Sequence, residues 1–270
     1  MNLAYGANSS AAAAAFDRVA SSYDESFTHT AIGRAQRKQA WSCLLAAFPP
    51  GGRILELNCG TGADARFLAG HGRSVLSCDA SAAMIAVARR RSHGLSNVEY
   101  RHIANESLGI LSEEEPFDGA FSNFSGLNCV AELNPVAREL ANLVKPGARV
   151  LLCLWSRFCL AEVFWYLLRG QPKKAVRRFS GEATATLDGI RMPVYYPTVG
   201  KIRRSLAPWF RLESHRAIGL FVPPSYVEPW MSRHSKMLDG LEWLDRACCD
   251  WPILRGAGDH VLLEFVRCNP

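Results

Sequence analysis

The sequence lacks the features that would assign it to several specialised classes of protein. Apolar runs such as residues 150–155 are far too short to cross a bilayer. The first sixteen residues, MNLAYGANSSAAAAAF, have no basic start, and their apolar part is mostly alanine, so they do not resemble a secretory signal. No repeat and no low-complexity segment occurs beyond the alanine run at 11–15. We therefore expect a cytoplasmic protein with a loosely ordered N-terminal lead-in and no transmembrane segment.

Cysteine spacing also excludes the usual structural roles of that residue. The chain has nine cysteines, an odd number, and no two of them form a CxxC pair. Most lie inside apolar runs, which is typical of reduced, buried thiols. We expect neither a disulfide framework nor a bound metal.

Positive charge is concentrated in one part of the chain. The net charge is +6, and residues 169–211 hold ten lysines or arginines against Glu182 and Asp188. Such an excess has two interpretations: an acidic partner, substrate or surface nearby, or simply a solvated helix face. The sequence alone leaves both open.

The first half of the chain alternates short apolar strands with helical segments. Two helices are expected between residues 16 and 48, and Pro and Gly residues at 49–52 end the second. The apolar patterns then predict strands at 53–57, 74–79, 98–103, 117–122 and 149–155, with helices at 63–69, 81–91 and 135–143. Ser81 is placed as the N-cap of the second of these helices. This order predicts an α/β, doubly wound, mostly parallel sheet with its ligand at the carboxyl ends of the strands.

The rhythm changes after residue 156. We expect an apolar-then-basic helix over 157–180, a hairpin over 183–197 around Asp188-Gly189, a strand near 210–217, a polar helix over about 226–249 and a last strand at 260–266. We interpret the chain as one domain. Residues 1–48 form a helical lid, 49–156 a binding core, 157–197 an inserted cap and 198–270 the completion of the sheet.

A glycine turn follows the first predicted strand, in the stretch ILELNCGTGAD at 54–64. Residues 60–65 fit the loose GxGxx(G/A) pattern of dinucleotide sites, where a pyrophosphate rests on a helix N-terminus. Glu56 would oppose that pyrophosphate, but it would favour the ammonium and sulfonium of S-adenosylmethionine (SAM). Asp79, at the end of the second strand, could bind the ribose of either ligand. The charge of Glu56 favours SAM.

Five stretches together resemble one family. ILELNCGTG and the following VLSCDAS are similar to motifs I and II of the class I SAM-dependent methyltransferases, as are FDRVASSYD at 16–24, FDGAFSNFSGLN at 117–128 and LVKPGARVLLCLW at 143–155. The chain resembles the small-molecule branch, in particular domains of the ubiquinone and menaquinone biosynthesis type. The resemblance implies a Rossmann-like sheet of seven strands and SAM as cofactor.

The same resemblance implies roles for single residues. Glu56 would serve the methionine amino group and Asp79 the ribose. Family members usually carry glycine where this chain has Asn58, which tolerates the left-handed conformation. Ile103 stands where an acidic residue often binds the adenine, which leaves Asn105 as its substitute. The other implied SAM contacts are Tyr23, Arg37, Cys59, Gly60, Gly62, Ala80, Met84, Ala104, Asn123 and Phe124.

We expect a methyl transfer by in-line displacement to a small, lipophilic or aromatic acceptor, both hydrophobic and anionic. His29 and His215 are the histidines expected within reach of it, but no base is assigned. Aromatic residues of the predicted cap and its flank could either enclose the acceptor or only pack against one another. They are Phe158, Phe164, Trp165, Tyr166, Tyr195, Tyr196, Trp209 and Phe210.

Two other functions stay open. The basic segment would suit an RNA methyltransferase, but SNFSGLN after the fourth strand lacks the acidic, proline-bearing tetrapeptide of nucleobase N-methyltransferases, so nucleic acid is not the expected partner. A SAM-binding protein that catalyses a reaction other than methylation would carry the same motifs. We expect a monomer or a homodimer.

Overall fold

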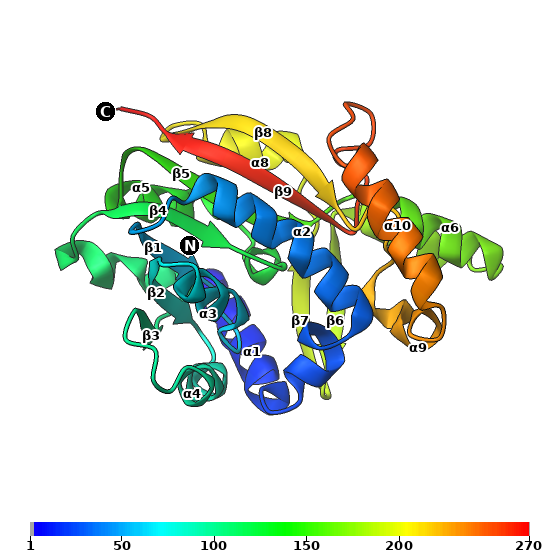
Figure 1. Ribbon diagram of the computed structural model, residues 1–270, viewed down its shortest axis with the longest axis horizontal. Coiled ribbons are helices and arrows are strands. Elements are labelled where there is room, and N and C mark those ends of the chain that lie inside the picture. The colour runs from blue at the N-terminus through cyan, green and yellow to red at the C-terminus, as the bar shows by residue number, and fades with distance from the viewer. Residues whose placement is uncertain (1–2, 270) are drawn as a thin grey trace.

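A seven-stranded sheet forms the centre of the computed structural model, which describes residues 3–269 (Figure 1). The strand order is β3-β2-β1-β4-β5-β9-β8. The strands β1 to β5 run parallel, and β9 lies antiparallel between β5 and β8. This sheet confirms the predicted fold class. The strands are β1 (Arg53–Leu57), β2 (Ser74–Asp79), β3 (Val98–His102), β4 (Phe117–Ser122), β5 (Val144–Trp155), β8 (Phe210–Ile218) and β9 (His260–Arg267).

Helices connect the parallel strands as the alternating pattern predicts. Helix α3 (Ala63–Gly70) follows β1, α4 (Ala82–Arg91) follows β2, and the 3-10 segment η2 (Asn105–Glu113) follows β3. The short η3 (Gly126–Cys129) and α5 (Leu133–Leu143) lie between β4 and β5. Ser81 caps α4, because its Oγ accepts a hydrogen bond of 3.1 Å from the Met84 N–H. The predicted N-cap of this helix is confirmed.

Both faces of the sheet are buried. Alternate residues of β1 point to opposite faces. Leu55 and Leu57 pack in one apolar cluster with residues of α5 and α8 (Val199–Leu206), whereas Ile54 packs in a second cluster with residues of α2 (Ala31–Ala47) and α3. Because helices cover both faces, a ligand can reach this sheet at the ends of its strands.

The N-terminal segment is helical from Leu3. Helix α1 (Leu3–Val19) is followed by the π-helical turn η1 (Asp24–Thr28) and by α2 (Ala31–Ala47), which crosses the sheet in Figure 1. The expectation of a loosely ordered lead-in is therefore wrong for the described residues, and its first two residues lie outside them. Alanine has the highest helix propensity, and the small Ala12 and Ala15 pack against Met192 of the later hairpin.

The predicted helix over 157–180 is broken into three pieces. Helix α6 (Leu160–Leu168) is followed by α7 (Pro172–Ala175) and by η4 (Arg177–Ser180). Gly170, with φ of +66°, and Pro172 separate the first two. The predicted hairpin is confirmed as β6 (Glu182–Leu187) and β7 (Ile190–Tyr195). Asp188 and Gly189 form its turn with φ of 46° and 78°, as a two-residue turn of this type requires.

The C-terminal third completes the sheet through α8 (Val199–Leu206), η5 (Ser225–Val227), α9 (Glu228–Met231) and α10 (Ser235–Cys248). The predicted helix over 226–249 is thus interrupted at residues 232–234. All nine cysteines are free thiols. Within residues 3–269, no helix has the length and apolar character that a membrane span requires.

Alanine substitutions at two glycines should change the free energy of unfolding in opposite directions. A Cβ at Gly119 of β4 would lie 2.8 Å from Cδ1 of Phe48 and 3.0 Å from the Arg149 carbonyl, whereas a Cβ at Gly240 of α10 meets no atom within 4 Å. We expect Gly119→Ala to lower the free energy of unfolding by about 1–3 kcal/mol. Gly240→Ala should raise it by roughly 0.5–1 kcal/mol. Urea denaturation measures both, and equal effects would contradict the packing described.

Candidate functional site

A cavity of about 580 Å³ lies at the carboxyl ends of β1, β2 and β4. The glycine turn forms one side of it, and α1, η1, the β6–β7 hairpin and the start of β9 form the others. It brings together eleven of the predicted SAM contacts, whereas Glu56, Gly62 and Ala104 do not line it. The eleven are Tyr23, Arg37, Asn58, Cys59, Gly60, Asp79, Ala80, Met84, Asn105, Asn123 and Phe124.

The glycine turn is built from three left-handed residues. Asn58, Gly60 and Gly62 have φ of 57°, 53° and 74°. Asn58 adopts the conformation expected of it, and its Oδ1 accepts a hydrogen bond of 3.0 Å from Ser122 Oγ. A Cβ at Gly60 would meet no atom within 4 Å, so open space lies beside its backbone, whereas one at Gly62 would collide with the Tyr100 ring. Gly60 therefore leaves room for a ligand, and Gly62 allows close packing.

Asp79 fastens the turn to the end of β2. One carboxylate oxygen accepts a hydrogen bond from the Gly60 N–H and the other from the Ser81 N–H, both at 2.8 Å. Burial raises the pKa of Asp79, and these two hydrogen bonds oppose that rise. Each oxygen keeps a further lone pair, so the carboxylate can accept two ribose hydroxyls without releasing the turn.

Glu56 lies behind the cavity wall. Its side chain is buried, and Oε2 accepts a hydrogen bond of 2.6 Å from Ser77 Oγ on β2. Burial, and then the charge of Asp64, raise its pKa well above the ordinary value. A bound cation would lower that pKa again. The role of Glu56 toward a methionine amino group stays a prediction.

Asp64, which sequence reasoning did not single out, is the centre of the polar wall. In the first turn of α3 it pairs with Arg37 and accepts hydrogen bonds from Trp41 Nε1 at 2.6 Å and Asn123 Nδ2 at 3.0 Å. The Arg37 guanidinium lies 4.6 Å from the centre of the Phe124 ring. Its Nε is buried with no hydrogen-bond partner among the described residues. The only signal was an acid in the first turn of a helix, where many helices carry one.

Two carboxylates hold the N-terminal segment over the glycine turn. Asp17 of α1 accepts hydrogen bonds from Ser81 Oγ at 2.6 Å and the Ala83 N–H at 3.0 Å. Asp24 accepts one of 2.6 Å from Thr61 Oγ1 and pairs with Arg91. These contacts explain the FDRVASSYD motif. They also bring Tyr23 to the cavity, where burial raises the pKa of its phenol.

The histidine on the cavity wall is not one of the two expected there. His29 is exposed after η1, and His215 is half-buried on the edge strand β8; neither lines the cavity. His260, at the start of β9, does line it and is fully buried, with its ring 5.4 Å from the Phe124 ring. Sequence reasoning missed His260 because only the folded sheet brings β9 next to β5.

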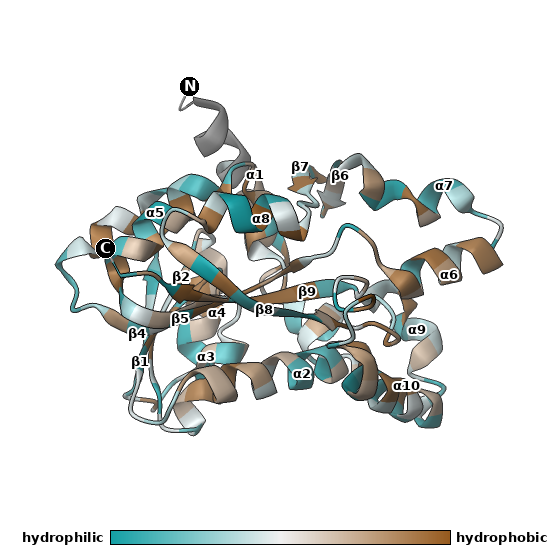
Figure 2. Cartoon of the chain, turned by 90° about the horizontal axis from the view of Figure 1, so that it is seen from above, coloured by the Kyte–Doolittle hydropathy of each residue, from teal (hydrophilic) through white to brown (hydrophobic). Residues whose placement is uncertain are grey.

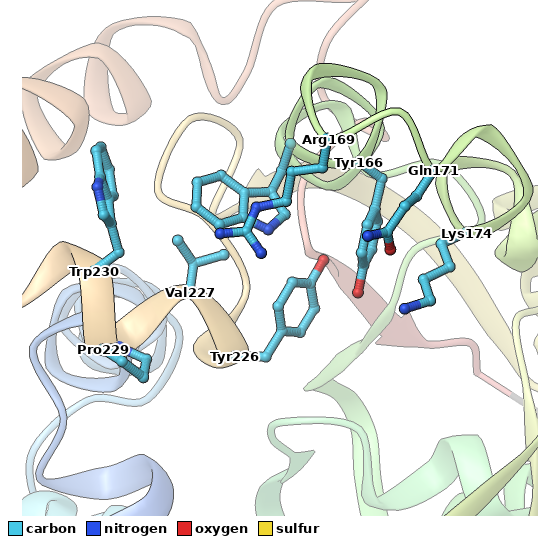
Figure 3. Close-up of a pocket in the computed structure, with 9 residues that line it drawn as sticks. Tyr166, Arg169, Gln171, Lys174, Tyr226, Val227, Pro229 and Trp230 are labelled. Carbon is cyan, nitrogen blue, oxygen red and sulfur yellow. The ribbon is translucent and has the colours of Figure 1, made fainter.

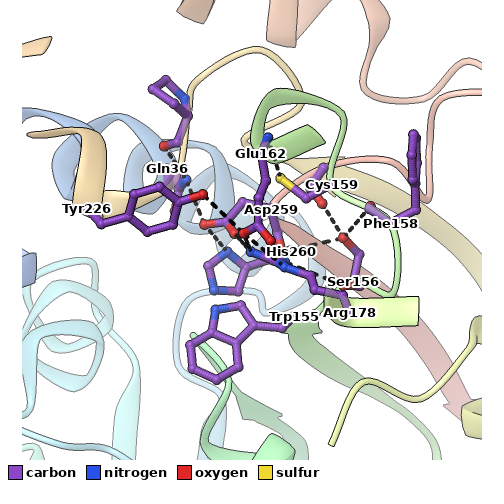
Figure 4. A network of polar contacts seen from close by, with 12 residues as sticks. Gln36, Trp155, Ser156, Phe158, Cys159, Glu162, Arg178, Tyr226, Asp259 and His260 are labelled. Atoms are coloured by element: carbon purple, nitrogen blue, oxygen red, sulfur yellow. Dashed lines mark hydrogen bonds and ion pairs between the residues drawn. The ribbon is translucent and has the colours of Figure 1, made fainter. Parts of the chain in front are cut away.

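A buried ionic network supports His260 from behind (Figure 4). Arg178 Nη2 lies 2.7 Å from both Asp259 Oδ1 and Glu162 Oε2, and Gln36 donates a hydrogen bond of 3.2 Å to Asp259 Oδ2. His260 Nδ1 is 3.5 Å from that same Oδ2. Burial lowers the pKa of His260 to about 4; Asp259 opposes this, whereas Arg178 and Arg37 add to it. The imidazole is therefore neutral at physiological pH.

The sequence is similar to those of known methyltransferases. A family described as "Methyltransferase domain" matches residues 54–147. A demethylmenaquinone methyltransferase of Clavibacter sepedonicus is 34% identical over 143 residues, which are 53% of this chain and 57% of that protein. A demethylmenaquinone methyltransferase of Thermobifida fusca (strain YX) is 30% identical over 178 residues, which are 64% of this chain and 74% of that protein. The chain belongs to the class I SAM-dependent methyltransferases.

The fold of this methyltransferase also matches solved structures. A SAM-dependent methyltransferase from Mesorhizobium loti has a TM-score of 0.53 at 21% identity, covering 84% of this chain and 96% of that one. SAM, the cofactor of the family, suits the residues found here. The open space beside Gly60 and the free lone pairs of Asp79 would suit its ribose, and the unpartnered Nε of Arg37 would suit its methionine carboxylate.

The buried state of His260 predicts a dependence of stability on pH. A histidine whose folded pKa is depressed to about 4 must charge on unfolding below its ordinary value of 6.5, so acid favours the unfolded state. When the pH falls from about 7.5 to 5, the free energy of unfolding of the wild-type protein should fall by roughly 2 kcal/mol more than that of His260→Asn. Urea denaturation at the two pH values measures the difference. Parallel losses in both proteins would show that His260 is not held neutral.

Proposed function

We propose that this methyltransferase transfers the methyl group of SAM to a small, lipophilic acceptor held in the same cavity. The observation that carries the proposal is the composition of that cavity. One side is the polar glycine turn with Asp79, and the other is an apolar wall. The donor and the acceptor would thus lie in one enclosed space, as an in-line displacement requires.

The apolar wall comes from elements outside the binding core. Helix α1 and the β6–β7 hairpin contribute aliphatic and aromatic side chains to it, and two more residues lie at or next to η3. The predicted cap therefore contributes its hairpin, whereas its aromatic helix packs elsewhere, for example Trp165 on Trp230 at 5.8 Å. The wall consists of Ala12, Ala13, Phe16, Val19, Cys129, Val130, Ala185, Leu187 and Met192.

The chain would act by binding, orienting and excluding water. SAM supplies an already activated methyl group. Asp79 and Arg37 would hold the two ends of the donor. Residues 1–48 would serve as a lid and residues 157–197, through their β6–β7 hairpin, as a cap. Neutral His260, with Asp259 behind it, is placed to accept a hydrogen bond from a hydroxyl of the acceptor. A phenolic or otherwise weakly acidic acceptor suits this wall best.

The relatives support this acceptor class. Their names state that they methylate demethylmenaquinone, a lipophilic aromatic compound in keeping with the apolar wall. The chain spans little more than half the length of the Clavibacter relative, so the acceptor here is proposed as a class only. A cytoplasmic monomer or homodimer stays the expected form.

Transfer of labelled methyl from SAM tests the proposal directly. The assay compares lipophilic phenols and quinols with total RNA and with hydrophilic phenols. Labelled lipophilic product would support it. Label in RNA would favour the RNA methyltransferase instead. SAM binding without label in any product would favour a reaction other than methylation.

Asp79→Ala should weaken SAM and S-adenosylhomocysteine binding by roughly 30- to 150-fold, because hydrogen bonds to a charged group contribute about 1.5–3 kcal/mol each before water replaces them in part. Calorimetry measures both affinities. Asp118→Ala is the matched control, since this carboxylate also accepts a backbone N–H, that of Arg53 at 2.8 Å, at the opposite end of the sheet. An equal loss in the control would show a general effect on folding.

A bulky side chain placed on the apolar wall should impair binding of the acceptor without impairing binding of the donor. Ala185 of β6 lines the cavity, and Ala183, two residues earlier on the same face of the strand, does not. We expect Ala185→Trp to lower kcat/KM for a lipophilic acceptor by about tenfold or more, equivalent to about 1.4 kcal/mol. SAM affinity should change little. Steady-state kinetics compare it with Ala183→Trp. An unchanged kcat/KM in Ala185→Trp would place the acceptor elsewhere, and loss of SAM binding would place the donor beside this wall.

A further inference from the structure

A second surface combines exposed apolar side chains with unpaired cations at the end of α6. Phe164, Leu167 and Leu168 are 64%, 55% and 69% exposed; Arg169 follows them directly, and Lys173 and Lys174 lie in the next helix, α7. Together these six residues are called the α6–α7 surface. Figure 2 shows α6 extending away from the sheet as a strongly hydrophobic helix. An apolar face directed to water marks a contact site.

The apolar part is one face of the helix and not a scatter of residues. Positions 164, 167 and 168 are three and four apart, so their side chains share one side of α6. The opposite side is fixed to the protein, because buried Glu162 pairs there with Arg177 and Arg178. The outward direction of the apolar face is therefore built into the fold.

The charge of the surface is not compensated locally. Residues 169–181 include no Asp or Glu. Glu162 pairs with Arg177 and Arg178, but Arg169, Lys173 and Lys174 form no ion pair within residues 3–269. Residues 169–181 hold five of the ten cations of the basic segment. A structural role accounts for two of these five and leaves three that can meet an anionic partner.

An aromatic pocket of about 350 Å³ adjoins these cations (Figure 3). Arg169 lies 4.4 Å from the ring centre of Trp165, and Lys174 lies 5.7 Å from that of Tyr166. Tyr226 and Trp230 complete the rim. Protein segments that lie at a lipid–water interface are enriched in Trp and Tyr together with Arg and Lys.

We propose that the α6–α7 surface docks on a membrane of anionic phospholipids. Phe164, Leu167 and Leu168 would enter the acyl boundary while the three cations contact lipid phosphates. A second copy related by two-fold symmetry would place the same cations against one another, which disfavours that occupant. The proposal goes beyond the proposed function and does not depend on it, since docking requires no methyl transfer.

Vesicle sedimentation of the full chain tests the proposal. Vesicles of phosphatidylcholine with phosphatidylglycerol are compared with vesicles of phosphatidylcholine alone. We expect binding to the anionic vesicles that weakens as salt rises, because surface charges are screened over roughly 10 Å at 0.1 M salt. Absence of binding, or equal binding to both kinds of vesicle, overturns the proposal.

Matched variants locate the contact. Leu167→Ser/Leu168→Ser and Lys173→Glu/Lys174→Glu should each lower vesicle affinity by about tenfold or more. Arg203→Glu/Arg204→Glu makes the same change of charge on exposed positions of α8 and should retain most of the binding. An equal loss in the α8 variant overturns the placement on α6. The proposal is also overturned if the protein binds no vesicles and light scattering shows a dimer that the Leu167→Ser/Leu168→Ser change dissociates.

Discussion

The buried pair of Arg37 and Asp64 is the interaction on which the rest of the site depends. It joins α2 to the first turn of α3, and through Asn123 the same carboxylate reaches the end of β4. Trp41 adds a third donor and stacks on Phe67 at 4.0 Å, which aligns α2 and α3 further. Removing one partner of such a pair leaves a buried charge, which costs roughly 3–5 kcal/mol. One carboxylate therefore holds Arg37 of α2 and Asn123 together in the polar wall of the cavity.

Other carboxylates extend this arrangement around the cavity. Asp79 ties the glycine turn to β2, while Asp17 and Asp24 tie the N-terminal segment to α4 and to the turn. Each accepts hydrogen bonds from N–H or hydroxyl groups near the start of a helix, where the helix dipole also favours a negative charge. Asp64 and Asp79 themselves line the cavity as negative groups, with Arg37 as the lining cation against them. This polarity suits a ligand that carries both an amine and a carboxylate.

The sequence predicted the parts of the structure that depend on neighbours along the chain. The strands β1, β2 and β4, the Ser81 cap and the Asp188-Gly189 turn each follow from a short local pattern, and they were placed at the observed residues. Asp64 and His260 were missed because their roles arise from contacts between distant segments. Asp64 lies 27 residues from Arg37 and 59 from Asn123. The break in the helix predicted over 157–180 had a local signal, Gly170 followed by Pro172, that was not given enough weight.

The same distinction explains why the donor could be predicted and the acceptor could not. The donor side of the cavity is made by turns that follow single strands, so its chemistry can be recognised in stretches of a few residues. The side proposed to hold the acceptor is made by α1, the β6–β7 hairpin and the first residues of β9, which meet only after folding. In the sequence its apolar side chains resemble ordinary core residues. Nothing in the residues around Met192, for example, shows whether its side chain faces a ligand or packs against a helix. Acceptor selectivity can therefore change through substitutions in α1 and the hairpin while the donor motifs stay the same.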